Sequence, residues 1–390
     1  MAAPLSPAIE ATFAPPVMQA RGWLDGVDFT PERPLINLSQ AAPVDPPPEG
    51  LRAALAEAVL HDPAAHLYGP VLGLPELRAE FAAHTARLYG GAVAAENVAI
   101  TAGCNQAFCA AIATLAQAGD EVLLPVPWYF NHKMWCDLSG VAAVPLPTDA
   151  ALLPDPDDAA RRITDRTRAI VLVSPNNPGG AEYPPDRIAA FAALARRRGL
   201  ALILDETYRD FHSRAGAPHP LFADPDWGDT LIQLYSFSKA YRLTGHRVGA
   251  VVASPARLAA LEKFLDTVGI CAPQIGQRGA LWGLRHLGAW LAGERDEILA
   301  RRAAVTAGLA RLPGWELKGA GAYFAYVTHP HDIPSDVLAQ RLVREAGVLM
   351  LPGTMFMPEG AGGGEMRIAF ANADRDGIAA LIDRLAAFTP

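Results

Sequence analysis

Four clusters of polar or reactive side chains each follow a short apolar run in this chain of 390 residues. They are TAGCNQAF (101–108), SPNNPGG (174–180), DETYRDF (205–211) and SFSKAYRLTGHRVG (236–249). Together they supply an amine, a carboxylate, a guanidinium and glycine-rich turns. A suitably placed lysine amine can act as a nucleophile, and arginine with backbone N–H groups binds phosphate. Each cluster is a weak signal alone, but their order and spacing are hard to produce by chance.

The elements that must position these clusters are short apolar runs of five or six residues. Most show no alternation of apolar and polar residues, which is typical of strands buried on both faces. Helical segments such as PPDRIAAFAALARRRG lie between several of them. We therefore predict an α/β fold with a mainly parallel seven-stranded sheet wrapped by helices, whose strand ends bind the ligand. The seven runs are NVAIT, EVLLP, VAAVPL, RAIVLV, LALILD, TLIQLY and GAVVA.

The pattern changes after Ala253 to long helices followed by short strands, which predicts a smaller α+β domain. The expected helices are Pro255–Val268, Ile275–Leu291 and Glu294–Leu309, and the expected strands are Tyr323–Val327 and Met366–Ala371. The first stretch, to about Pro48, is proline-rich and irregular, with one short strand at 35–38. Regular structure then begins, and it includes a helix that Pro75 opens and Gly90 closes. We expect three parts: an N-terminal arm that joins the small domain (1–48), a large ligand-binding domain (49–275) and a small C-terminal domain (276–390).

Composition excludes several classes of protein. The chain has 33 basic and 41 acidic residues, a net charge of −8, which argues against a nucleic-acid partner. No apolar run approaches the roughly 18 residues that a membrane span needs. The N-terminus lacks the features of a signal peptide, and the four cysteines form no CxxC pair. We expect a cytoplasmic protein with reduced thiols. No third ligand joins His61 and His66, or His329 and His331, so no metal site is expected.

The order and spacing of the four clusters resemble the class I/II aminotransferases, which are fold-type I pyridoxal-phosphate enzymes. The resemblance runs from about Leu35 to the C-terminal helix. It implies pyridoxal 5'-phosphate as cofactor and Lys239 as the amine that forms a Schiff base with its aldehyde. It also implies that Asp205 keeps the pyridine nitrogen protonated, and that Asn177 and Tyr208 hydrogen-bond the ring's phenolic oxygen.

The resemblance also implies a phosphate site. Gly103, Cys104 and Asn105 lie between a strand and a helix, where their amides would point at the phosphate. Ser236, three residues before the lysine, and Arg247, eight residues after it, match the family's other phosphate ligands.

Three further residues match family positions. Tyr129, in PWYFNH, aligns with the aromatic that stacks on the cofactor ring, with Trp128 as its competitor. Arg367, in EMRIAFA, matches the arginine that binds the substrate α-carboxylate. Tyr68 resembles the tyrosine that reaches the neighbouring subunit's cofactor, which implies a homodimer.

The sequence departs from the family at a few positions. Gly179 replaces a usual threonine, and Ala41 replaces a glycine that passes close to the substrate. Asp266 occupies the neighbourhood where aspartate-specific relatives carry an arginine, so a dicarboxylate substrate is disfavoured. Arg21 and Trp23, in the arm, are candidates for lining the substrate pocket.

We expect an aminotransferase that moves an amino group from an L-α-amino acid to a 2-oxo acid. β-Lyase, decarboxylase and amino-acid oxidase chemistry remain alternatives, because the sequence does not show which bond at the substrate Cα is labilised. A serine acyl-enzyme is refuted by the order of the YFN and SFSK segments and by the absence of KTG. A Rossmann dehydrogenase lacks its GxGxxG, and a DNA-binding regulator lacks a basic N-terminal module.

Overall fold

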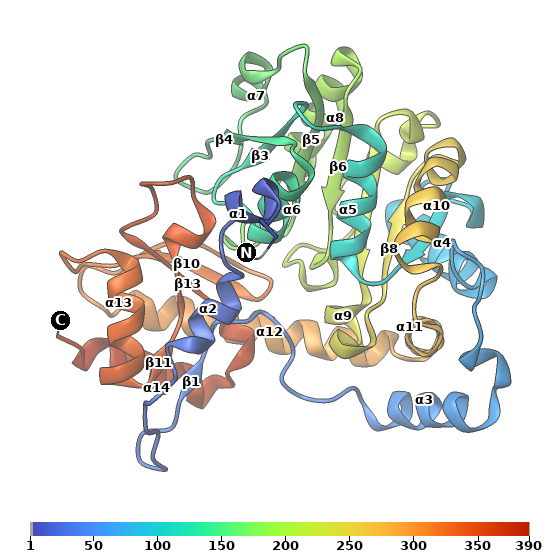
Figure 1. Ribbon diagram of the computed structural model, residues 1–390. Helices are drawn as coiled ribbons and strands as arrows, with labels where there is room; N and C mark the ends of the chain where they lie inside the picture. The colour runs from blue at the N-terminus through green and yellow to red at the C-terminus, as the bar shows by residue number, and fades with distance from the viewer. Residues whose placement is uncertain (1–2, 390) are drawn as a thin grey trace.

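The computed structural model describes residues 3–389, and its largest element is a seven-stranded sheet (Figure 1). Each of the seven predicted apolar runs forms one strand, which confirms the predicted fold. The strands are β2 (Val98–Thr101), β3 (Glu121–Pro125), β4 (Ala142–Leu146), β5 (Thr167–Val173), β6 (Ala201–Asp205), β7 (Leu231–Ser236) and β8 (Gly249–Val252).

The strand order is β2-β8-β7-β6-β5-β3-β4, and only β8 runs antiparallel to its neighbours. The ends of β5 and β6 lie in register, with Val173 opposite Asp205. Gly249, which starts β8, pairs with Ser236 at the end of β7 and with Thr101 at the end of β2. All four polar clusters therefore meet at one edge of the sheet.

Two layers of helices cover the sheet, and successive strand residues alternate between them. Ile170 belongs to the core that contains side chains of α4 and α8, whereas Val171 belongs to a separate core that contains side chains of α5 and α10. This burial on both faces explains the unalternated apolar runs. No helix within residues 3–389 is long and apolar enough to span a lipid bilayer. The helices are α3 (Glu49–His61), α4 (Pro75–Tyr89), α5 (Cys104–Leu115), α6 (Phe130–Ser139), α7 (Pro156–Arg162), α8 (Pro185–Arg198), α9 (Phe237–Ala240), α10 (Pro255–Gly269) and α11 (Gln274–His286).

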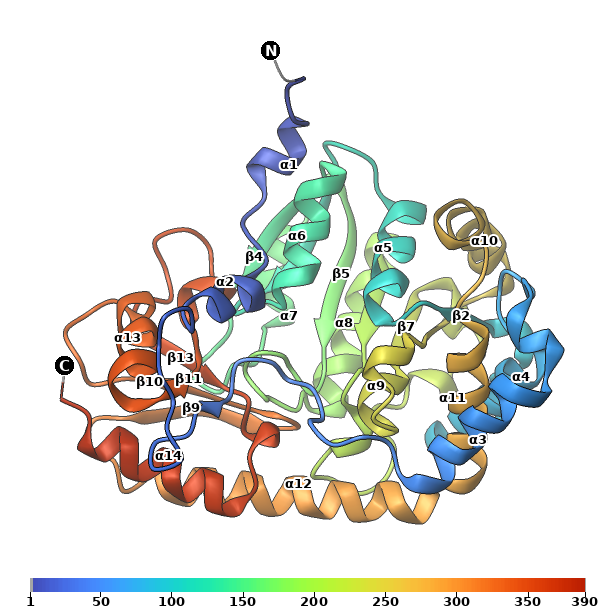
Figure 2. The same ribbon diagram turned by 60° about the horizontal axis from the view of Figure 1, so that its bottom comes forward.

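A second unit contains a four-stranded antiparallel sheet of order β12-β13-β10-β9. The long helix α12 runs beneath both units and packs against α14 and β9 (Figure 2). The N-terminal arm joins this unit because β1 pairs in parallel with β11, Ile36 opposite Val348. The elements are β1 (Ile36–Asn37), α12 (Gly288–Leu309), β9 (Glu316–Gly321), β10 (Phe324–Thr328), α13 (Ser335–Arg341), β11 (Val348–Leu349), β12 (Leu351–Pro352), β13 (Glu365–Ile368) and α14 (Arg375–Ala387).

Two expectations about helices were wrong. The arm is not irregular before its strand, because it contains α1 (Pro7–Ala11) and α2 (Pro16–Gly22), both with proline in the first turn, where its missing N–H costs nothing. The break between α11 and α12 lies at Leu287 rather than near 292. Leu287 is buried, and its backbone (φ −104°, ψ 15°) departs from helical geometry, which ends α11 before α12 begins.

Candidate active site

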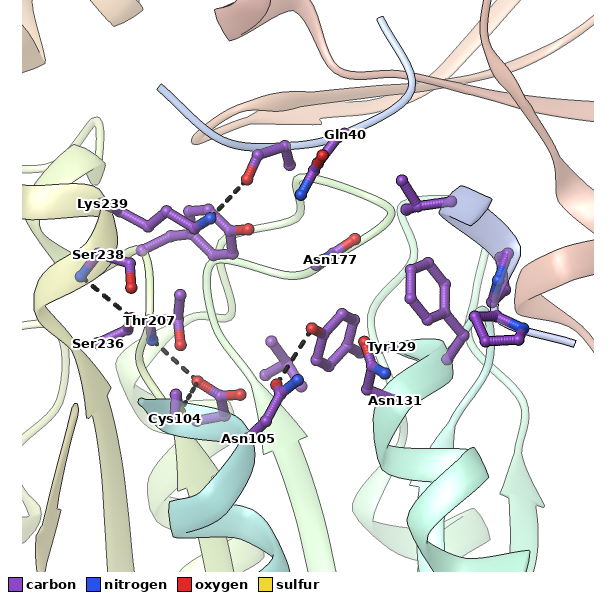
Figure 3. Close-up of a pocket in the computed structure, with 18 of the residues that line it drawn as sticks. Gln40, Cys104, Asn105, Tyr129, Asn131, Asn177, Thr207, Ser236, Ser238 and Lys239 are labelled. Atoms are coloured by element: carbon purple, nitrogen blue, oxygen red, sulfur yellow. Dashed lines mark hydrogen bonds between the residues drawn. The ribbon is translucent and has the colours of Figure 1, made fainter. Parts of the chain in front are cut away.

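A cavity of about 420 Å³ lies at the sheet edge where the four clusters meet (Figure 3). Of the residues predicted to act in catalysis or to bind cofactor or substrate, Gly103 and Tyr68 do not line this cavity and the others do. Gly103 lies just behind the lining, whereas Tyr68 is 80% exposed on the surface of the chain. The predicted residues that line it are Ala41, Cys104, Asn105, Tyr129, Asn177, Asp205, Tyr208, Ser236, Lys239, Arg247 and Arg367.

Lys239 extends into the cavity from α9, the single turn that follows β7. Its Nζ donates a hydrogen bond of 2.6 Å to the carbonyl oxygen of Ala41. Desolvation of the amine, with the positive charges of Arg247 and Arg367, lowers the pKa of Lys239 to about 8. An appreciable fraction of the amine is therefore unprotonated near neutral pH and can act as a nucleophile or a base.

Asp205 ends β6 and is buried at the base of the cavity. Its Oδ1 accepts a hydrogen bond of 2.9 Å from the Thr207 amide, and its Oδ2 lies 3.3 Å from Nε2 of His132. Burial alone would raise the pKa of Asp205, but the hydrogen bond and charge of His132, with Thr207, outweigh it and hold the pKa below its usual value. Asp205 is therefore a carboxylate despite its burial.

His132 is a site residue that the sequence analysis missed. It is buried on α6, one turn after Tyr129, and its ring stacks on Phe108 with 3.8 Å between ring centroids. The available signal was the spacing in WYFNH, because residues three apart lie on one face of a helix. The role of His132 is to contact Asp205, which is 73 residues away in the chain, and sequence spacing could not pair the two.

The first turn of α5 and Arg247 form an anion-binding corner. Gly103 caps the 12-residue helix with φ +86°, and a Cβ built there would lie 2.2 Å from Nη2 of Arg247. Arg247 donates to the Thr244 carbonyl at 2.9 Å and has the uncommon φ of +52°. The Oγ of Ser236 accepts from the Ser238 amide at 3.3 Å. Free N–H groups at a helix N-terminus beside a guanidinium suit a phosphate.

The two candidate aromatics separate clearly. Tyr129 lines the cavity, and its hydroxyl donates to Oδ1 of Asn105 at 3.2 Å. Trp128 is buried and instead lines a neighbouring groove, together with Trp23 from the arm. Arg21 does line the cavity, whereas Trp23 does not. Tyr129, the predicted residue, is thus the one at the cavity, although spacing alone does not show which face of the loop each aromatic occupies.

Arg367 projects from β13 and is almost wholly buried beside the cavity. It donates to Oδ1 of Asn177 at 3.1 Å and to the carbonyl oxygen of Ser39. Its Nε has no hydrogen-bond partner among residues 3–389, and burial lowers the pKa of the guanidinium to about 10. Tyr208 is buried close by, and its ring lies 5.9 Å from Nζ of Lys239. A buried arginine with neutral partners and an orphan N–H is suited to a carboxylate.

These donors fit a phosphorylated aldehyde with a basic ring nitrogen: an amine for the aldehyde, a buried carboxylate for the nitrogen and a phosphate corner. Together with the sheet topology they define a pyridoxal-phosphate-dependent enzyme of fold type I. The chain belongs to the class I and II aminotransferase family, whose sequence profile matches residues 33–385. This confirms the predicted family, activity and cofactor.

Individual relatives agree with this placement. The chain is 31% identical to an aromatic aminotransferase of Arabidopsis thaliana over 79% of this chain and 78% of that protein. It is 29% identical to an aspartate aminotransferase of Pyrococcus horikoshii over 89% of each chain. The solved structure of aspartate aminotransferase from Thermus thermophilus with maleate superposes with a TM-score of 0.89, 26% identity and 99% coverage of both chains.

Proposed function

We propose that this aminotransferase moves the amino group of an L-α-amino acid to a 2-oxo acid, with Lys239 as the residue that holds the cofactor and moves the substrate proton. One observation carries this proposal: Lys239, Asp205 and Arg247 line a single cavity at the carboxyl edge of the sheet. When bound, pyridoxal phosphate supplies an aldehyde that captures amines and a protonated ring that withdraws electrons from the substrate Cα.

Each residue around the cavity then has a defined task. The carboxylate of Asp205, kept ionised by His132, would hold the proton on the ring nitrogen. Tyr208 and Asn177 would donate to the ring's phenolic oxygen, and Tyr129 would cover one face of the ring. The phosphate would be held by the five residues at the anion-binding corner, namely Gly103, Cys104, Asn105, Ser236 and Arg247.

The substrate is oriented by Arg367, which we propose binds its α-carboxylate in place of the present bond to Ser39. Lys239 would then take the proton from the substrate Cα and deliver it to the aldehyde-derived carbon of the cofactor. Its pKa of about 8 supports this role, because a base works best when its pKa lies near the working pH. Ala41 would form the wall of the substrate pocket next to this amine.

A homodimer is part of the proposal. Tyr68 is 80% exposed and its neighbour Leu67 65%, which supports a surface that a second subunit covers, with Tyr68 reaching that subunit's cofactor. A cytoplasmic location also stays a prediction; the free thiols of Cys104, Cys109, Cys136 and Cys271 are consistent with it.

The domain division stays a proposal as well. Pairing of β1 with β11 supports an arm that joins the small domain. Helix α11 packs against α3 and α4 of the large domain, so we propose that the junction lies near Leu287 rather than at 275/276.

The decisive experiment compares the holoenzyme with Lys239→Ala. Each protein is mixed with a panel of amino acids, and the absorbance change from the aldehyde to the amine form of the cofactor is recorded. We expect the change with wild type, a loss of at least about 1,000-fold with Lys239→Ala, and no loss with Lys263→Ala at an exposed site on α10. Release of ammonia, carbon dioxide or peroxide without that change would instead support a lyase, decarboxylase or oxidase.

A further inference from the structure

Three consecutive residues of the arm, 39–41, offer neutral oxygen atoms to three cations of the cavity. Arg367 donates to the carbonyl oxygen of the first, Arg21 to the side chain of the second and Lys239 to the carbonyl oxygen of the third. Neutral oxygens are weaker acceptors for cations than carboxylates are. Anionic ligands could therefore replace these bonds.

Arg21 is the one of these cations that the proposed function does not use. It lies in the last turn of α2 and lines the mouth of the cavity. Its Nη2 donates to Oε1 of Gln40 at 2.7 Å, and it forms no ion pair with a carboxylate within residues 3–389. The Gln40 bond fixes the guanidinium at the cavity without neutralising its charge.

The charges that line the cavity are unbalanced. Arg21, Lys239, Arg247 and Arg367 face it, and Asp205 is its only acidic lining residue within the described part of the chain. Asp205 is already paired with a buried histidine. In the proposed function a phosphate occupies Arg247 and an α-carboxylate occupies Arg367, which leaves the charge of Arg21 without a counterpart.

We infer that Arg21 binds a second carboxylate, carried by the substrate's side chain, so that the preferred amino donor is a dicarboxylic amino acid. This inference rests on the proposed function of the cavity. Val17 and Phe130 line the same cavity and would contact the methylene groups between the two carboxylates. Asp266, the sequence argument against such a donor, is exposed on α10 and is not among the residues that line the cavity of the described chain.

The test compares donors of equal shape and different charge. The ratio of kcat/KM for glutamate to that for glutamine is measured in the wild-type holoenzyme, Arg21→Gln and Arg21→Lys. Because Arg21 is exposed at the cavity mouth, water and salt weaken its effect, and we expect the ratio to fall about tenfold in Arg21→Gln. Arg21→Lys, which keeps the charge but not the paired N–H donors, should recover part of the ratio.

Binding provides a readout that does not depend on turnover. Calorimetric titration of the holoenzyme with succinate and with butyrate compares a dicarboxylate with a monocarboxylate of the same chain length. We expect succinate to bind more tightly to wild type, and this preference to fall about tenfold in Arg21→Gln. Arg311→Gln removes the same charge from an exposed site in the small unit. It should leave unchanged both the preference for glutamate over glutamine and the preference for succinate over butyrate.

The outcomes separate the two proposals. If neutral donors convert the cofactor but Arg21→Gln alters neither ratio, the assignment of Arg21 is wrong and the proposed function stands. If Arg21→Gln lowers kcat/KM equally for glutamate and glutamine, Arg21 maintains the structure of the site and does not bind the side-chain carboxylate, which also overturns the inference. If no amino acid converts the cofactor in wild type, the proposed function itself fails.

Discussion

Nε2 of His132 lies 3.3 Å from Oδ2 of Asp205, and both side chains are buried, Asp205 at the base of the cavity and His132 outside its lining. The histidine comes from α6, which covers one face of the sheet, whereas the carboxylate ends a central strand. Stacking on Phe108 fixes the imidazole ring. The position and the charge of the carboxylate are thus set from outside the cavity, by a side chain that does not line it.

Replacing His132 by Phe should therefore weaken the enzyme through Asp205. The variant keeps an aromatic ring against Phe108 but loses the nitrogen that lowers the pKa of the carboxyl. Asp205 then protonates at a higher pH, so the acid limb of the profile of kcat against pH moves to higher pH, and kcat at neutral pH falls about tenfold. His61→Phe, at an exposed histidine on α3, is the control. An unmoved acid limb would contradict this role.

Gly103→Ala should loosen the phosphate corner specifically. Its Cβ would lie 2.2 Å from Nη2 of Arg247, so the guanidinium must move, and we expect the Kd for pyridoxal phosphate to rise at least about tenfold. Gly119→Ala is the matched control, because that glycine has a similar φ of +90° but no atom within 4 Å of its added Cβ. Both variants should lose about 1 kcal/mol of stability from the positive φ. Equal cofactor affinity in the two variants would contradict a specific effect of the Gly103 Cβ on Arg247.

The lowered pKa of Lys239 predicts a pH dependence of stability in the protein stripped of cofactor. The amine has a pKa of about 8 in the folded chain and 10.5 in the unfolded chain. Between these values the unfolded chain binds more protons than the folded one, so the free energy of unfolding rises with pH across this window. Relative to Lys239→Met, the rise should reach at most about 3 kcal/mol. Urea unfolding of both proteins from pH 7.5 to 10.5 measures it; parallel curves would contradict the lowered pKa.

A shared active site predicts complementation between inactive variants. We expect Tyr68→Ala and Lys239→Ala both to be impaired. Lys239→Ala lacks the amine in its own cavity, whereas Tyr68→Ala lacks the hydroxyl that would reach the cavity of the other subunit. After the two are mixed under conditions that let subunits exchange, a mixed dimer would carry one site with neither substitution. Random exchange should then restore up to about a quarter of the wild-type sites. No gain in activity from mixtures shown to contain mixed dimers would exclude the role of Tyr68 across the interface.

Much of the fold could be predicted because its strands are buried on both faces. In β5, Ile170 and Val171 face opposite helical layers, so no polar residue interrupts the run. The two-residue strands β11 and β12 carry no such signal and were not predicted. The helices of the arm were missed because a proline-rich stretch was expected to be irregular, although proline is favoured in the first turn of a helix.

The site was predictable where its residues follow strands and not where contacts cross the fold. Lys239 and Asp205 were found from the clusters that contain them. His132 and the Gln40 bond of Arg21 depend on pairs of residues that only the folded chain brings together. Likewise, which of Trp128 and Tyr129 faces the cavity depends on the path of one loop.

The contacts of residues 39–41 have a consequence for attempts to redesign this enzyme. The same short stretch accepts hydrogen bonds from Arg367 in the C-terminal unit, Lys239 in the large unit and Arg21 in the arm itself. A chimera that takes residues 1–48 from a relative would replace Arg21 and its acceptor Gln40 together, and the path of the new arm would decide where the carbonyl oxygens of residues 39 and 41 lie. We therefore expect a preference for one amino donor to be transferred between family members only when the arm and the C-terminal strands are exchanged together.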